Sequence, residues 1–128
     1  MKTKIILSAA AVWALGLAPQ ASAVVAVTQP GSTATGYTAP VVVTVKGETV
    51  TYANFDIDVH DIRSNDNRPA GSASYCVLSP DACPLFYSDL LEIGQSGPVY
   101  GSNLLPAGTY GFYCSWHTWM KGSLVVEG

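Results

Sequence analysis

The feature that most limits the fold of this chain is the frequent occurrence of glycine and proline along it. The 128 residues include 12 glycines and 8 prolines, and the apolar stretches between them are short. "VVVTV" (41–45) and "GSLVVEG" (122–128) have the composition of strands, and no segment after residue 23 repeats apolar residues with a helical period. This pattern predicts one all-β domain, a sandwich of antiparallel strands.

Several strands can be placed by composition and alternation. They are expected at 24–27, 41–45, 49–54, 107–114 and 122–128, with loops at 29–40 and 65–72. The turn at 46–48 predicts a hairpin between the second and third of these strands. The region 73–105 is irregular, and "PLFYSDLL" (84–91) is the only stretch in it that favours a helical turn.

The first 23 residues have the organisation of a secretory signal peptide. Lys2 and Lys4 precede an apolar run over residues 5–17, and "ASA" (21–23) is a small-x-small cleavage pattern. We therefore expect cleavage after Ala23, a mature domain of residues 24–128, and a periplasmic, extracellular or cell-surface location. The apolar run is shorter than the ~20 residues that a membrane-spanning helix needs, so no membrane span is expected.

The charge of the mature segment argues against nucleic acid as a partner. Without the signal peptide, four basic residues face nine acidic ones, a net charge of −5. Phosphate backbones require clustered lysine and arginine, and these four basic residues are scattered. An acidic surface either suits a basic protein partner or simply keeps the protein soluble.

Export also affects the three cysteines, because thiols outside the cytoplasm tend to pair. Cys76 and Cys83 flank a turn in "YCVLSPDACP" (75–84), and a disulfide between them would stabilise the fold by roughly 2 to 3 kcal/mol. Two alternatives stay open. Either Cys76 or Cys83 pairs with Cys114 instead, or both Cys76 and Cys83 remain free thiols.

A second cluster of reactive side chains lies in "CSWHTWM" (114–120). Alternation along "AGTYGFYC" (107–114) places Cys114 on the buried face of a strand, and the chain must turn before the last strand begins at Gly122. Such a turn would converge Cys114, His117 and Met120. Each has an ordinary structural role when taken alone, but together with His60 they supply the donors of a blue-copper site: a thiolate, two imidazoles and a thioether. Zinc would also accept the cysteine and the histidines, but would leave the methionine without a purpose.

Two segments of the chain resemble the cupredoxins, the family of small blue copper proteins that includes plastocyanin, pseudoazurin and amicyanin. They are "KGETVTYANFDIDVHDI" (46–62) and "PAGTYGFYCSWHTWMKGSLVVEG" (106–128), and the CxxHxxM spacing is most similar to amicyanin. The resemblance implies a cupredoxin-like antiparallel Greek-key β-sandwich. It also implies four metal ligands: His60, Cys114, His117 and Met120.

The function that this resemblance implies is one-electron transfer between redox partner proteins. One type 1 copper would cycle between Cu(I) and Cu(II) in a monomer, with partners docking near His117, Trp116 and Trp119. Alternatively, a tryptophan packs over the site to exclude water. No enzyme is expected, because two histidines cannot build the oxygen-reducing copper cluster of a multicopper oxidase. Two other functions stay open: a copper storage, buffering or delivery protein, and a metal-free interaction domain.

The surroundings of His60 lead to two further expectations. In a straight strand, alternation would point His60 into solvent together with Asp56 and Asp58. The cupredoxins have a loop here, so residues 58–60 are expected to bend out of strand geometry. Asp61 occupies a position where relatives commonly have asparagine; it could still bond Ser115, and its charge would be expected to lower the reduction potential.

Overall fold

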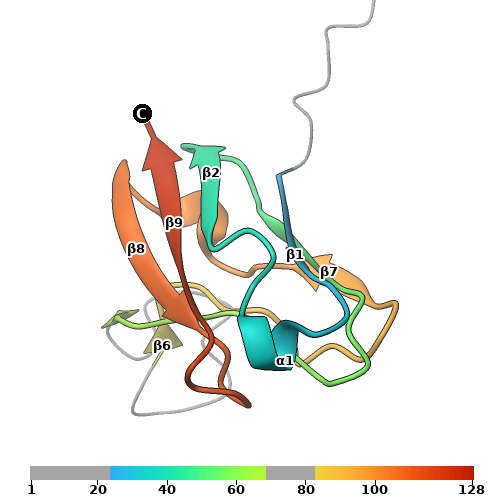
Figure 1. Cartoon of the computed structure of the whole chain (residues 1–128). Helices are drawn as coiled ribbons and strands as arrows, with labels where there is room; N and C mark the ends of the chain where they lie inside the picture. The colour runs from blue at the N-terminus through green and yellow to red at the C-terminus, as the bar shows by residue number, and fades with distance from the viewer. Residues whose placement is uncertain (1–23, 69–82) are drawn as a thin grey trace, which may run out of the picture.

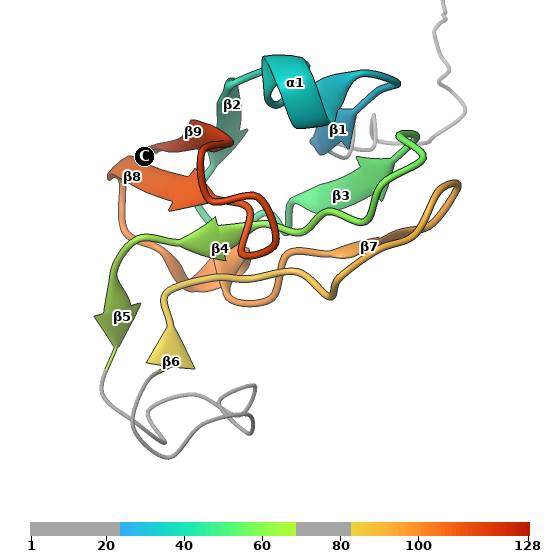
Figure 2. The same ribbon diagram turned by 60° about the horizontal axis from the view of Figure 1, so that its bottom comes forward.

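Seven of the described strands form two facing sheets in the computed structural model, which describes residues 24–68 and 83–128 (Figures 1 and 2). The first sheet has the order β1 (Val25–Thr28), β3 (Thr51–Asn54), β7 (Ser96–Pro98). The second has the order β2 (Val41–Val45), β9 (Lys121–Glu127), β8 (Gly108–Tyr113), β4 (Arg63–Ser64). The predicted all-β sandwich is confirmed, and the predicted signal peptide lies outside the described residues.

Four short elements complete the described part of the chain. β5 (Asn67–Arg68) pairs with β6 (Cys83–Pro84), and η1 (Ser102–Leu104) is a single 3-10 turn that precedes β8. A one-turn helix, α1 (Ser32–Thr35), lies between β1 and β2. Within the described ranges, neither helix is long and apolar enough to cross a membrane.

The sheets are mixed, which corrects the expectation of purely antiparallel pairing. β1 runs parallel to β3 and β2 runs parallel to β9, whereas β8 pairs with β9 and β3 with β7 in antiparallel fashion. The predicted hairpin between 41–45 and 49–54 is wrong, because β2 and β3 belong to different sheets. β2 buries alternate residues on one face, whereas β3 is buried at Tyr52, Ala53 and Asn54, and placing the two strands in facing sheets lets both contribute to one interior.

The region 84–91 forms no helical turn, which is a second correction. Phe86 and Leu91 are buried, and Tyr87 forms an isolated bridge with Tyr100. The segment instead places Phe86 and Leu91 in the core while its backbone bonds neighbouring segments. Tertiary pairing therefore outweighs the weak local preference for a helical turn.

The interior is apolar and close-packed around aromatic rings. Its buried side chains include Ala26, Val42, Val50, Tyr52, Ile62, Phe86, Val99, Leu105, Phe112, Leu124 and Val126. Gly122 shows how tightly this core closes, since a Cβ there would lie 2.4 Å from Cζ of Phe112. Only glycine leaves room for the ring, and the approach fixes the register where β9 begins.

Candidate metal centre

The position of His60 is set by a bend that begins where β3 ends. The side-chain amide of Asn54 donates to the backbone oxygens of Asp58 (2.8 Å) and Leu91 (2.9 Å), and its oxygen accepts the backbone N–H of Asp56 (2.9 Å). His60 and Leu91 then form a two-way backbone bridge. Residues 58 and 59 are outside any strand and His60 makes only this bridge, so the expected departure from strand geometry is confirmed.

The bend reverses the exposure that alternation alone predicts. His60 is fully buried and Asp56 nearly so, whereas Ile57 is 82% exposed. Nε2 of His60 lies 2.7 Å from Oδ2 of Asp56. Burial of Asp56 opposes its ionisation, but the hydrogen bonds from His60 and from backbone N–H groups outweigh it and hold the pKa of this carboxyl below its usual value. With Nε2–H donated to the carboxylate, the Nδ1 lone pair of His60 faces the site.

Cys114 follows directly after β8 and is fully buried as a free thiol. This rules out the alternative in which Cys114 pairs with another cysteine. Burial is the largest cause of the raised pKa of the Cys114 thiol. A bound metal cation would reverse this preference, because a coordinating thiol is deprotonated. The predicted partner of Cys83, Cys76, lies outside the described residues, so their disulfide stays a prediction.

The loop from Cys114 to Met120 folds back on itself through two backbone hydrogen bonds. Cys114 N–H donates to the Met120 oxygen (3.1 Å), and Met120 N–H donates to the His117 oxygen (2.9 Å). The expected turn before the last strand is thus present. Nδ1 of His117 lies 3.7 Å from Sγ of Cys114, and Met120 is buried in the same loop.

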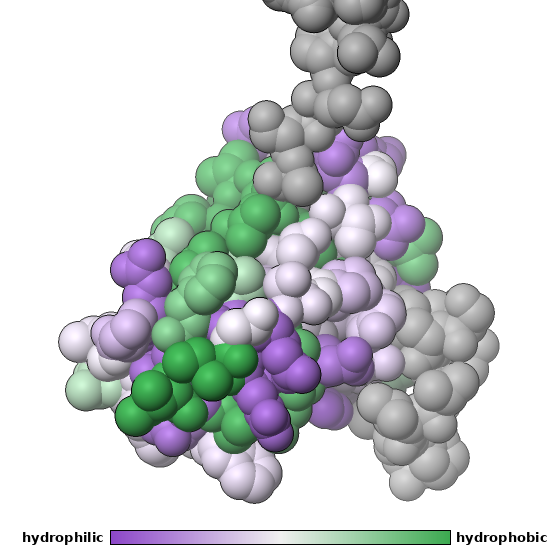
Figure 3. Space-filling view, turned by 90° about the vertical axis from the view of Figure 1, so that its right-hand side faces the viewer, coloured by the Kyte–Doolittle hydropathy of each residue, from purple (hydrophilic) through white to green (hydrophobic). Residues whose placement is uncertain are grey.

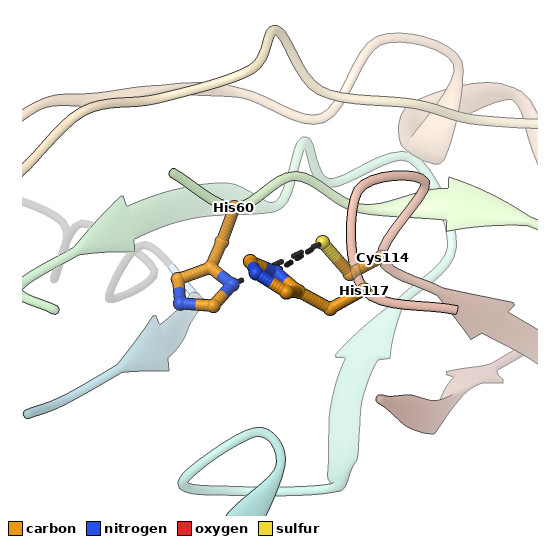
Figure 4. A group of neighbouring side chains, drawn as sticks. All are labelled: His60, Cys114 and His117. Atoms are coloured by element: carbon orange, nitrogen blue, oxygen red, sulfur yellow. Dashed lines mark hydrogen bonds between the residues drawn. The ribbon is translucent and has the colours of Figure 1, made fainter. Parts of the chain in front are cut away.

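Three of the four predicted ligands converge in the structure. The candidate ligand atoms of His60, Cys114 and His117 lie within 4.8 Å of one another, and all three residues are buried. Nδ1 of His60 is 3.9 Å from the Cys114 sulfur, and the two ring centroids are 4.7 Å apart. Figure 4 shows one ring nitrogen of each histidine turned towards the sulfur. One soft sulfur and two imidazole nitrogens make a donor set that suits copper.

Asp61 links the segment that carries His60 to the loop that carries Cys114 and His117. Its carboxylate accepts the backbone N–H of Ser115 (2.7 Å) and also the Ser115 hydroxyl. The hydrogen bond anticipated from the sequence is therefore present in spite of the change from asparagine. The buried Tyr37 hydroxyl donates to the backbone oxygen of Asp61 (2.6 Å), and burial is the main cause of its strongly raised pKa. Together these bonds hold the residue after His60 against the residue after Cys114.

The two tryptophans lie on the outside of the cluster. Trp116 is 64% exposed and Trp119 is 62% exposed. Trp119 packs edge-on against the His117 ring, with centroids 5.3 Å apart, so it both covers the imidazole and presents a surface. Exposed apolar side chains also occur elsewhere, and Figure 3 shows one face on which apolar residues lie beside hydrophilic ones.

One residue beside this cluster, Thr33 of α1, has no distinguishing signal in the sequence. Its hydroxyl lies 2.6 Å from Oδ2 of Asp58, and its backbone oxygen accepts the indole N–H of Trp119 (2.9 Å). A threonine in a loop rich in glycine, serine and threonine has no distinguishing spacing. Only the fold, which places this turn against residues 56–58 and 119, identifies it.

Comparison with solved structures identifies this arrangement of strands as that of the cupredoxins. The chain is similar to a purple cupredoxin from Nitrosopumilus maritimus, with 25% identity, a TM-score of 0.61, and 81% of this chain and 99% of that one covered. A reduced mutant of amicyanin is 26% identical, with a TM-score of 0.57 and 88% of each chain covered. Amicyanin from Paracoccus versutus is 24% identical over 84% of each chain, with a TM-score of 0.56, and supports the fold alone.

No protein-family model and no curated protein matches the chain. The expected resemblance to the cupredoxins is nevertheless confirmed by the solved structures. Another of these structures is named as a Cu(I) form of amicyanin, at 26% identity and with 82% of each chain covered. The buried group of two histidines and one cysteine, together with these neighbours, indicates copper binding.

Proposed function

We propose that this chain, which has the cupredoxin fold, binds one type 1 copper through His60, Cys114, His117 and Met120 and carries single electrons between redox proteins. The observation that carries the proposal is the buried group of one sulfur and two imidazole nitrogens within 4.8 Å. Copper at such a site supplies reversible one-electron chemistry, since the soft sulfur suits Cu(I) and the imidazoles suit Cu(II).

The residues around the cluster suit a site that changes little between two oxidation states. His60 is oriented by Asp56, and the backbone N–H of Ser115, next to Cys114, is held by Asp61. Donors that are fixed before the metal binds need little rearrangement when the electron moves. Burial of all three donors also keeps water from the metal.

The outer edge of the site offers a route for the electron. His117 is 8% exposed and lies beneath the edge of Trp119, next to the exposed Trp116. We infer that a redox partner docks on this apolar surface, over the buried imidazole. Four protein donors leave no coordination position for a substrate, so the proposed role is that of a carrier and not of an enzyme, in a protein exported by the signal peptide.

The test is retention of copper through redox cycles. The copper-loaded protein is reduced and reoxidised repeatedly with a Cu(I) chelator outside the site, and bound copper and visible absorption are followed. A carrier keeps one equivalent of copper and recovers its colour after each cycle. Transfer of the copper to the chelator on first reduction would contradict the carrier role and favour copper delivery.

A further inference from the structure

The one-turn helix α1 contacts residues that flank both candidate histidine ligands. The Thr33 hydroxyl lies 2.6 Å from Oδ2 of Asp58 and 3.3 Å from Oδ2 of Asp56. Asp56 bonds Nε2 of His60, and Asp58 lies 4.0 Å from Nε2 of His117. One side chain thus lies between the carboxylates that face the outer nitrogens of the two imidazoles.

The backbone of the same turn makes two more contacts of this kind. The Thr33 oxygen accepts the indole N–H of Trp119, whose ring packs against His117. The Gly31 N–H donates to Oδ1 of Asp56 at 3.3 Å. Figure 1 shows α1 beside the loop that joins β8 to β9. The turn therefore contacts Asp56 and Asp58, which precede His60, and also Trp119, which follows His117.

The distances indicate where the single hydroxyl proton of Thr33 goes. A separation of 2.6 Å is a strong hydrogen bond to a carboxylate, and one of 3.3 Å is weak. Thr33 therefore donates mainly to Asp58. This bond holds the Asp58 carboxylate, which is 53% exposed, at 4.0 Å from His117, beyond hydrogen-bond distance.

We propose that Thr33 is a positioning residue for the His117 imidazole, because its bond to Asp58 keeps this carboxylate from binding Nε2 of His117. The inference rests on the proposed copper site. Without the hydroxyl, the Asp58 carboxylate is free to turn to His117. An imidazole whose outer N–H is bound by a carboxylate is a stronger donor, which favours Cu(II) and lowers the reduction potential.

Three variants separate this role from simple stabilisation of α1. Thr33→Val keeps the shape and removes the hydroxyl, and Thr33→Ser restores the hydroxyl. Thr35→Val is the matched control, since the exposed Thr35 donates to the Gly31 oxygen (3.1 Å) within the same helix. Each protein is measured in two ways: imidazole nitrogen resonances of the metal-free form, and the reduction potential of the copper-loaded form. Thr33→Ala replaces the valine variant if the latter does not fold.

We expect Thr33→Val to shift the His117 ring resonances in the metal-free protein and to lower the potential with copper bound. Thr33→Ser should restore both, and Thr35→Val should change neither. Equal behaviour of Thr33→Val and Thr35→Val in both measurements would overturn the inference. Failure of the wild type to bind copper would overturn the proposed function instead, while the metal-free resonances would still decide the role of Thr33.

Discussion

The two histidines of the candidate site are held in opposite ways. His60 has no exposed surface, its backbone bridges Leu91 in both directions, and its outer nitrogen is bound by a buried carboxylate. His117 lies in a loop closed by two backbone bonds, and its outer nitrogen is 4.0 Å from the largely exposed Asp58. The half of the site around His60 is therefore held rigidly, whereas the half around His117 is more accessible.

The largest effect is expected at Asn54, which holds the rigid half. Its fully buried amide makes four hydrogen bonds, two as donor and two as acceptor. Asn54→Ala leaves several of these partners unpaired and should reduce the free energy of unfolding by on the order of 3 kcal/mol. Urea denaturation measures this change.

The exposed Asn65 provides a matched control for this substitution. Asn65→Ala should change stability by less than ~0.5 kcal/mol, as is usual at a surface position. Equal losses in the two variants would mean that the bend after β3 is not the rigid part of the molecule.

A second comparison uses the two carboxylates that face the histidines. Asp56→Ala removes the partner of a buried N–H and should lower copper affinity by roughly 10- to 100-fold. Asp58→Ala should lower it much less, because Asp58 makes no short contact with His117. Competition titrations with a chelator of known affinity give both values. A larger loss in Asp58→Ala would reverse the assignment of the rigid and accessible halves.

The smallest effect on stability, but a distinct effect on function, is expected at Trp116. Trp116→Ala removes an exposed ring and should change the free energy of unfolding by less than ~0.5 kcal/mol. Loss of an aromatic anchor from a docking surface should slow electron self-exchange by about 5-fold or more. Line broadening in mixtures of the reduced and oxidised protein measures this rate.

Val45→Ala is the control for that measurement. Val45 is 48% exposed and pairs with Glu127, at the end of β9 opposite the candidate site. This variant should leave self-exchange unchanged. If Trp116→Ala also leaves it unchanged, electrons do not leave through the accessible half.

The sequence predicted the elements whose patterns are local. Alternation placed Phe112 of β8 and the following Cys114 on a buried face, and the glycine near the start of β9 marked the turn between β8 and β9. The convergence of Cys114 and His117 followed from that turn. These features depend on residues that are neighbours in the chain, so periodicity is sufficient to predict them.

Features that depend on distant contacts were predicted poorly. Alternation alone pointed His60 into solvent, because it could not include the bonds by which Asn54 bends the chain; only the family resemblance supplied the loop. The hairpin between 41–45 and 49–54 failed for a similar reason, since β2 and β3 pair with strands remote in sequence. Thr33 was not predicted because its role arises from contacts with Asp58 and Trp119, which are 25 and 86 positions away in the sequence.

A copper(II) titration followed by visible absorption, in the wild type and in Cys114→Ser, tests the copper site directly. We expect an intense blue or purple band that saturates at one equivalent of copper in the wild type and is absent from the variant, since the band requires thiolate bound to copper. A colourless titration of a protein whose Cys114 is shown to be reduced would contradict the copper site and every role built on it.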